Sequence, residues 1–292
     1  MIYIHTNINH QNMAADLPKP KLLLPMLTLL LLLLSNYMKK VDSQDTTSFQ
    51  IDTFKSNPSD LIYQGGAHVP PGSSYLSLVR TDSSGVPQQA SAGRVLYSPP
   101  VNFWEPGRQA TFETTIRFKI SPSASSGQAA DGLAFFIAPV NTTIPSGSTG
   151  GHLGIYDPSD RPTSLFAVEF DVYANQWDPS YNHVGININS RTSVNITRFE
   201  GLGQVVTARI NYNSNTKKIT VATNYGSKTS TLSYVYDLKN ALPQQVRVGI
   251  SASTGLSAAY VANFDVFSWY FTSTLVYTAN NDDNVNGGAF IK

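Results

Sequence analysis

The chain has 292 residues, with 20 Lys and Arg against 19 Asp and Glu, and it contains no cysteine. A net charge of +1 lacks the basic excess that neutralises a phosphate backbone, so the composition argues against a nucleic-acid-binding protein. Without cysteine the chain has no disulfide bonds, thiolate metal ligands or thiol nucleophiles. A hydrophobic fraction of 41% is that of a folded chain, and the length allows one large domain or two small ones.

The first 43 residues are predicted to be an N-terminal extension with a signal peptide. An apolar run over Leu22–Leu34 follows two lysines. A run of about 13 residues is too short for the roughly 20 that span a bilayer, and it is typical of the core of a signal peptide. Val41 and Ser43 fit the small-residue pattern before a cleavage site, so we expect a mature protein that starts near Gln44 and is secreted or vacuolar. An uncleaved membrane anchor is the alternative interpretation.

Beyond this segment the sequence predicts β-structure throughout. Short runs of strand-forming residues recur between clusters of Gly, Pro, Asn, Asp and Ser, and no stretch sustains a helical period for longer than a turn or two. A short helical turn is expected at Asp237–Leu242, where Pro243 ends it. Strands are predicted at Phe49–Ile51, Ala110–Ile120, Leu133–Ile137, Phe166–Tyr173, Val205–Tyr212, Lys218–Asn224, Val246–Ser251 and Val266–Tyr277.

The predicted strand at Ala110–Ile120 is expected to bury one face. Polar Thr115 and Arg117 alternate there with apolar Ile116 and Phe118. This alternation is typical of a strand with one face in the core and one face in water.

The predicted strands follow one another without helices between them. A hairpin turn is expected at Asn211–Asn215, between two of these strands. This organisation indicates a β-sandwich or barrel in a single domain over residues 44–278. A flexible tail is expected over residues 279–292.

Acidic and amide side chains cluster between Glu169 and Asp178 in a chain that is otherwise poor in charge. Glu169 and Asp171 are two residues apart on a predicted strand, so both carboxylates project from one face. Paired carboxylates repel each other unless a cation neutralises them, and Asn175, Asp178 and His183 follow on a loop that can fold over that face. An oxygen cluster suits Ca²⁺, and an added imidazole suits a first-row ion such as Mn²⁺. An ordinary polar loop with surface acids is the alternative.

Seven short motifs follow one another along the chain: LIYQG (Leu61–Gly65), GRVLY (Gly93–Tyr97), DGLAFFIAP (Asp131–Pro139), GGHLG (Gly150–Gly154), VEFD (Val168–Asp171), HVGI (His183–Ile186) and SWYF (Ser268–Phe271). Each motif is weak alone, but their order and separations are specific. From Ser48 to about Thr278 the chain resembles the legume lectins, a family of plant seed lectins. The resemblance implies a jelly-roll β-sandwich with a flat back sheet, a curved front sheet and a small top sheet. Loops above the front sheet would carry two metal ions and a shallow sugar pocket.

The resemblance also implies the metal ligands. Mn²⁺ would be held by Glu169, Asp171, Asp178 and His183, and Ca²⁺ by Asp171, the carbonyl oxygen of Tyr173, Asn175 and Asp178. Legume lectins usually have Asp where this chain has Asn187. Because that position is not a direct ligand in the family, we expect at most a modest effect on the hydrogen bonds around the ligands.

The same resemblance implies a sugar site. Asp131, Gly151 and Asn175 would contact sugar hydroxyls, and Tyr173 would stack on the apolar face of the ring. A carboxylate and an amide supply acceptor and donor groups, and a glycine N–H lets the backbone approach closely. The resemblance also implies that the peptide bond between Ala130 and Asp131 is cis. In the family, calcium stabilises this bond through a water molecule bound to the aspartate. We therefore expect metal-free protein to lose sugar binding while it remains largely folded.

The loop after Gly255 is expected to set the sugar preference. It begins with Leu256 and Ser257, and the stretch Leu256–Phe267 is longer than in mannose/glucose-binding relatives. Its length is closer to that of relatives that bind galactose or N-acetylgalactosamine. We therefore expect terminal galactose or N-acetylgalactosamine to be bound, with mannose or glucose as the alternative.

Two other classes of function are alternatives to sugar binding. A retaining glycoside hydrolase needs a second carboxyl about 5–5.5 Å from the first. The strand after Glu169 and Asp171 continues with Val172, Tyr173 and Ala174, so we expect no enzymatic activity. A storage or plant-defence protein that has lost sugar binding is the other alternative, although this chain keeps the ligands that such relatives usually lose.

The remaining expectations concern assembly, modification and location. Sequons at Asn141 and Asn195 predict N-glycosylation. The family commonly pairs subunits through the back sheet, whose edge would include the strand that starts at Phe49, so we expect a homodimer or homotetramer. The expected partners are the glycans of glycoproteins, with no nucleic acid and no membrane insertion, and the expected location is outside the cell or in seed protein bodies.

Overall fold

The computed structural model of the protein describes residues 26–32, 45–123, 128–159, 161 and 163–278. The chain divides into two units, residues 1–43 and 44–292. In the first unit the described residues 26–32 form a helix inside the predicted apolar run. The expected cleavage site after Ser43 and the tail at 279–292 lie outside the described residues. Within the described ranges, no helix has the length and the apolar composition that crossing a bilayer requires.

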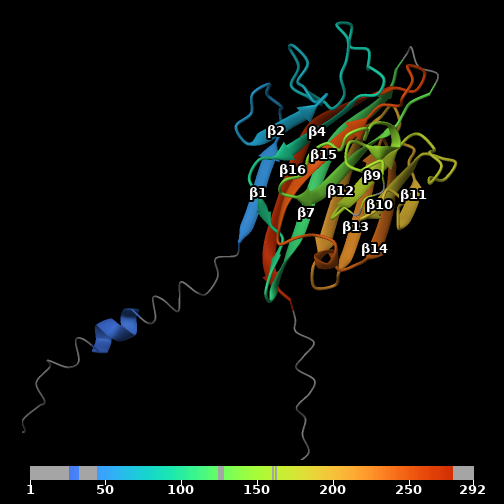
Figure 1. Cartoon of the computed structure of the whole chain (residues 1–292). Helices are drawn as coiled ribbons and strands as arrows, with labels where there is room; N and C mark the ends of the chain where they lie inside the picture. Colours follow the sequence, from blue (N-terminus) through green and yellow to red (C-terminus); the bar gives the residue numbers. More distant parts are fainter. Residues whose placement is uncertain (1–25, 33–44, 124–127, 160, 162, 279–292) are drawn as a thin grey trace, which may run out of the picture. The chain divides into compact units, whose positions relative to one another are not determined.

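The second unit is an all-β sandwich of two antiparallel sheets, each with eight strands (Figure 1). The back sheet has the strand order β1 (Thr46–Ile51), β16 (Ala262–Tyr277), β7 (Arg108–Pro122), β12 (Val205–Asn213), β13 (Lys218–Tyr225) and β14 (Lys228–Val235), with β3 (Leu76–Ser77) paired to β16 and β6 (Trp104–Glu105) paired to β7. The front sheet has the order β11 (Asn195–Arg198), β10 (His183–Ile188), β9 (Phe166–Asp171), β8 (Gly132–Pro139), β15 (Gln245–Ser253), β4 (Ala92–Tyr97) and β2 (Leu61–Gly65), with β5 (Val101–Asn102) paired to β15.

The expected all-β sandwich is confirmed, and β1 lies at an edge of the back sheet as expected. The described residues form no separate small top sheet. Instead the two-residue strands β3, β5 and β6 join the large sheets, because strands this short supply too few hydrogen bonds to form a sheet of their own.

The back sheet has one buried face, as the alternation in β7 predicts. Ile116 and Phe118 are fully buried, whereas Arg117 between them is exposed. The buried face packs against the front sheet through aromatic rings. The ring of Phe112 in β7 lies 6.3 Å from that of Phe135 in β8 and 6.1 Å from that of Phe166 in β9. The main core therefore lies between the two sheets.

The front sheet is buried on both faces near its centre. Phe135 and Phe166 point into the core between the sheets, while their neighbours Phe136 and Ala167 belong to a second apolar cluster. Leu153, which follows the short 3-10 helix η1 (Gly150–His152), is part of that second cluster. The loop that contains η1 therefore covers the outer face of β8 and β9 and is held close to the ends of these strands.

All eight predicted strands are present, with shifted ends. The predicted strand Phe166–Tyr173 stops at Asp171, because the chain bends into a polar loop there. The predicted hairpin joins β12 to β13, and the predicted helical turn is the 3-10 helix η2 (Leu238–Asn240). The side chain of Asp237 caps η2 by accepting a hydrogen bond from the backbone N–H of Lys239.

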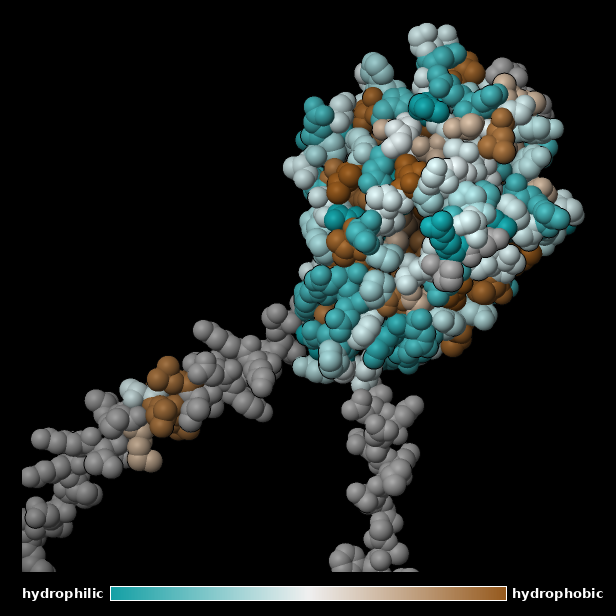
Figure 2. All heavy atoms as spheres, in the orientation of Figure 1, coloured by the Kyte–Doolittle hydropathy of each residue, from teal (hydrophilic) through white to brown (hydrophobic). Residues whose placement is uncertain are grey.

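The surface of the second unit is mixed in polarity. Figure 2 shows hydrophobic residues on the face it presents as small, separate groups among hydrophilic ones. Leu256 is 70% exposed and Tyr260 is 39% exposed, and both belong to the loop that precedes β16. This loop also lines the site described next.

Candidate metal and sugar site

Two carboxylates leave the same face of β9. Glu169 and Asp171 lie opposite Gly185 and His183 of the neighbouring strand β10. Because side chains alternate along a strand, residues two apart share a face. Glu169 and Asp171 are each 2% exposed, and His183 is 1% exposed. The sheet therefore buries two acids and an imidazole side by side.

Three side chains form a compact group that can hold a metal ion. Glu169, Asp178 and His183 each offer one ligand atom, and these atoms lie within 4.8 Å of one another. Nε2 of His183 is 3.2 Å from Oε1 of Glu169. Asp178 reaches the group from the loop after β9, where its Oδ2 accepts a hydrogen bond of 2.9 Å from the backbone N–H of Asn175. Asp171 lies outside this group of three, and its Oδ1 accepts a hydrogen bond of 2.8 Å from the N–H of Tyr173.

Burial raises the pKa values of three aspartates in this region. Burial, with the charges of Glu169 and Asp178, holds the pKa of Asp171 well above its ordinary value. Burial likewise raises the pKa of Asp178 to about 6 and the pKa of Asp131 to about 7. A buried carboxylate resists ionisation unless a cation neutralises it. This concentration of acids is therefore unfavourable alone and favourable around a divalent cation.

Three of the residues expected in the metal and sugar sites carry a buried polar atom without a hydrogen-bond partner among the described residues. These atoms are Oδ2 of Asp131, Oδ1 of Asn175 and Nδ1 of His183. Buried polar atoms are normally paired, so unpaired oxygens beside an acidic group are suited to an ion or its bound water. Carboxylate and amide oxygens suit Ca²⁺, and the added imidazole suits Mn²⁺. The residues present therefore fit both ions that the resemblance implies.

Asn187 contributes to the hydrogen bonds that hold Glu169. Nδ2 of Asn187 donates to Oε1 of Glu169 at 3.2 Å, and Oγ of Ser193 donates to the same oxygen at 2.6 Å. Oγ of Ser193 is also 3.2 Å from Oδ1 of Asn187. An ionised Asp at position 187 would have no N–H to donate to Glu169. Asn187 therefore gives Glu169 a hydrogen bond that the Asp usual in the family cannot give.

A cavity of about 370 Å³ lies beside the acidic group. All six residues expected to contact sugar line it: Asp131, Gly151, Tyr173, Asn175, Leu256 and Ser257. Asp131 is 2% exposed, and Nδ2 of Asn175 lies 3.4 Å from its Oδ1. The peptide bond between Ala130 and Asp131 is cis, as expected. This cavity is called the sugar pocket below.

Gly151 leaves no room for a side chain at its place in the sugar pocket. A Cβ atom built on Gly151 would lie 2.3 Å from Oδ1 of Asn175. Any larger residue must therefore displace the Asn175 amide, which lies beside Asp131. Gly150 before it has a φ of +66°, a conformation that favours glycine. Both glycines let the η1 loop approach the two polar side chains closely.

Aromatic residues that the sequence did not single out also line the sugar pocket. They are Trp177, His152 and Tyr260. The rings of Tyr173 and Tyr260 meet edge to face at 5.3 Å, and the guanidinium of Arg191 lies 4.0 Å from the centre of the Trp177 ring. A tryptophan in a loop of Asn, Asp and Pro is the local signal that could have identified Trp177. Tyr260 is brought in by the fold from a distant loop, and no local pattern marks it.

Comparison with known proteins gives a consistent result. A family model described as the legume lectin domain matches residues 46–287. Agglutinin-2 of Cladrastis kentukea is 42% identical over 288 residues, which cover 94% of each chain. The mannose/glucose-specific lectin of Centrolobium tomentosum is 40% identical and matches 82% of this chain and 100% of its own. The solved structure of winged bean acidic lectin, complexed with methyl-α-D-galactose, superposes with a TM-score of 0.74 at 36% identity and covers 79% of this chain and 99% of its own.

Proposed function

Because this chain belongs to the legume lectin family, a family of sugar-binding proteins without enzymatic activity, we propose that it is a metal-dependent lectin for terminal galactose or N-acetylgalactosamine. One observation carries the proposal. The six expected sugar-contact residues come from four separate loops and line one cavity beside a buried acidic group. A storage or defence protein without sugar binding would need neither feature.

The polar wall of the sugar pocket suits the hydroxyl groups of a sugar. Asp131 offers acceptor oxygens, Asn175 offers an amide, and the backbone at Gly151 approaches without a side chain. Tyr173 is half-buried beside them and can cover the C–H face of the ring. We assign hydroxyl recognition to the first three residues and stacking to Tyr173.

We assign the metal ions to the acidic group next to the pocket. Mn²⁺ would take Glu169, Asp171, Asp178 and His183, and Ca²⁺ would take Asp171, the carbonyl oxygen of Tyr173, Asn175 and Asp178. When bound, the ions supply positive charge that stabilises ionised, buried carboxylates. Asn175 lies in both the sugar pocket and the calcium ligand set, so metal binding would fix the amide that contacts sugar.

Galactose or N-acetylgalactosamine is the preference we favour. The length of the Leu256–Phe267 stretch supports it, and the winged bean relative was solved with a galactoside. The Centrolobium relative is named for mannose and glucose, which keeps those sugars as the second candidate. Leu256 is 70% exposed at the mouth of the pocket, where it can contact a sugar or its neighbour.

We also propose the assembly, modification and location of the protein. The exposed edge of the back sheet at β1 supports pairing into a homodimer or homotetramer. Asn141 and Asn195 are both exposed sequon residues, which supports N-glycosylation in the secretory pathway. The native protein would then be secreted or stored in seed vacuoles. Light scattering tests the oligomeric state, and glycosidase digestion tests the N-glycosylation.

A glycan array tests the proposed function. Protein loaded with Ca²⁺ and Mn²⁺ should bind glycans that end in galactose or N-acetylgalactosamine, and EDTA-stripped protein should bind none. Metal-dependent binding to mannose alone would keep the lectin and reject the preference. No binding by folded, metal-loaded protein would reject the sugar-binding proposal in favour of a storage or defence role.

A further inference from the structure

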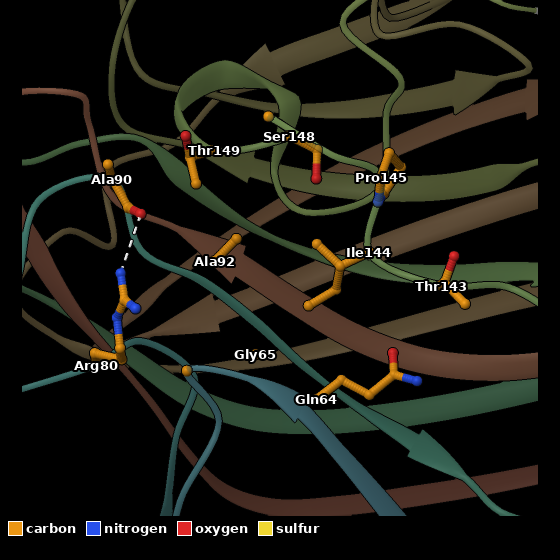
Figure 3. Close-up of a pocket in the computed structure, with 12 residues that line it drawn as sticks. Gln64, Gly65, Arg80, Ala90, Ala92, Thr143, Ile144, Pro145, Ser148 and Thr149 are labelled. Carbon is orange, nitrogen blue, oxygen red and sulfur yellow. Dashed lines mark hydrogen bonds between the residues drawn. The ribbon is translucent and has the colours of Figure 1, made fainter.

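A second cavity lies beside the sugar pocket. It has a volume of about 520 Å³ and is formed by the end of β2, the segment that leads into β4 and the loop that follows β8 (Figure 3). Thr149 lines both cavities. Their walls are also joined by a hydrogen bond of 2.8 Å from N–H of Ala90 to O of Gly255. This second cavity, called the side cavity below, is therefore the immediate neighbour of the sugar pocket across Thr149.

The charge of the side cavity is positive. Arg80 lines it, and its lining residues include no Asp or Glu. Nη2 of Arg80 donates to O of Ala90 at 3.5 Å, and Arg80 forms no ion pair with a carboxylate in the described part of the chain. Figure 3 shows Arg80 and Ala90 on one side of the cavity and Gln64 and Thr143 on the other. The guanidinium thus keeps donors for a bound group.

A second arginine contacts the opposite wall. Arg94 is fully buried, and its Nε donates to Oε1 of Gln64 at 2.5 Å while its Nη1 donates to Oγ1 of Thr142 at 3.2 Å. Because the amide oxygen of Gln64 is engaged by Arg94, the other end of the amide offers its N–H donors. The buried charge of Arg94 adds to the positive potential of this wall.

A buried hydroxyl group in the side cavity lacks a partner. Ser148 is 1% exposed, and its Oγ has no hydrogen-bond partner among the residues described by the structure. Figure 3 shows this oxygen directed towards the middle of the lining residues. A buried hydroxyl is costly unless it is hydrogen-bonded. An oxygen of a bound ligand would satisfy it.

We propose that the side cavity binds a carboxylate-bearing sugar residue that is linked to the sugar held in the sugar pocket. This inference rests on the proposed function. A terminal sugar bound in the sugar pocket is joined through its glycosidic oxygen to the next residue of the glycan, which therefore lies at the rim of the pocket. Any sugar can use neutral donors such as Gln64 and Ser148. Arg80 lines the cavity without an acidic partner, and the buried charge of Arg94 lies behind the Gln64 wall, so the cavity favours a carboxylate.

A pair of disaccharides that differ only in the carboxylate tests the proposal. Calorimetry on the metal-loaded full chain compares galactosyl-glucose with galactosyl-glucuronic acid, which has a carboxylate in place of one CH₂OH group. We expect the acidic disaccharide to bind roughly fivefold more tightly at low salt, and the difference to shrink in 0.5 M NaCl. If methyl mannoside binds and methyl galactoside does not, the same pair is built on mannose.

Three variants assign the effect to Arg80. Arg80→Gln should abolish the preference for the acidic disaccharide and change the affinity for methyl galactoside by less than about twofold. Arg80→Lys keeps the charge and should keep part of the preference. Arg209→Gln, an exposed back-sheet variant with the same loss of charge, should change neither affinity.

Equal affinity of the unaltered protein for the two disaccharides would overturn the proposal. A preference that survives Arg80→Gln would overturn it as well. If the proposed function is wrong, the result differs: neither methyl galactoside nor methyl mannoside binds to the metal-loaded protein.

Discussion

Side chains alternate between the two faces of a strand both in the back sheet and at the end of β9. This alternation buries apolar residues in the first region and acids in the second, with opposite effects on the stability of the fold. In β12 the alternation buries Val206, Ala208 and Ile210 completely. At the end of β9 it buries Glu169 and Asp171 almost as deeply. Apolar burial stabilises the fold by about 25 cal/mol per Å², whereas burial of an unpaired carboxylate destabilises it. The fold should therefore survive the loss of metal, while the binding site should not.

The largest expected effect is a loss of stability from a substitution in the core that leaves sugar binding unchanged. Phe112 is 2% exposed and its ring packs against those of Phe135, Phe166 and Tyr212. Phe112→Ala should lower the free energy of unfolding by about 3–5 kcal/mol, because it removes a buried ring and leaves a cavity. Denaturant titration measures the loss. The sugar affinity of the folded fraction should stay unchanged, and a large loss of affinity would show that the two regions are not independent.

Asp171→Asn should produce the reverse pattern. Loss of this carboxylate should lower sugar affinity at least about 100-fold in the presence of Ca²⁺ and Mn²⁺, because it removes a ligand that the two proposed metal sites share. Metal-free Asp171→Asn should nevertheless melt at a higher temperature than metal-free unaltered protein, since burial and neighbouring acids oppose the charge of Asp171. Calorimetric titration and thermal melts measure both effects. Asp52→Asn, at an exposed position, is the control, and a destabilised metal-free Asp171→Asn would contradict the expectation.

Gly151→Ala should weaken sugar binding with little change in stability. The added Cβ would meet Oδ1 of Asn175 at 2.3 Å, so the amide must move away from its place beside Asp131. A decrease in sugar affinity of about tenfold to 100-fold is expected from such misplacement. Gly107→Ala is the matched control, because Gly107 has a φ of +80° in open space. The control should lose about 1 kcal/mol of stability and no affinity, and equal affinities for the two variants would refute the steric role of Gly151.

The smallest expected effect is a pH dependence in the back sheet. Burial raises the pKa of Asp265 to about 6, although Lys119 and His68 oppose the shift. A carboxyl whose pKa is raised by folding contributes stability below about pH 4 and loses it as pH rises through 6. Asp265→Asn should therefore match unaltered protein at pH 4 and be more stable by about 1–2 kcal/mol at pH 7.5. Chemical denaturation at both pH values measures this, and a pH-independent difference would be the contrary result.

Local sequence patterns predicted the regular parts of the fold. The strands β7, β12 and β16 were predicted because apolar and polar residues alternate along them. β14 was not predicted, since its segment KTSTLSYV is mostly polar and has one buried residue, Leu232. β10 was also missed as a strand, because Gly185 and Asn187 interrupt its apolar character.

The site was predicted in part for local reasons and in part through the family resemblance. The spacing of Glu169 and Asp171 alone indicated a shared acidic face. Leu256 and Ser257 carry no local chemical signal, so only the resemblance pointed to them. Tyr260 was missed because its contact with Tyr173 depends on how two distant loops fold together.

A calorimetric titration before and after metal removal tests most directly whether metal ions on the buried acids create the sugar-binding site. Methyl galactoside and methyl mannoside are titrated into protein loaded with Ca²⁺ and Mn²⁺, into EDTA-stripped protein with metal content verified, and into protein restored with both ions. We expect the affinity of the protein for the sugar it binds to fall at least about 100-fold when the metal ions are removed and to return when they are restored. Circular dichroism should show the same β-sheet signal in all three samples. Full affinity in verified metal-free protein would contradict this role for the metal ions.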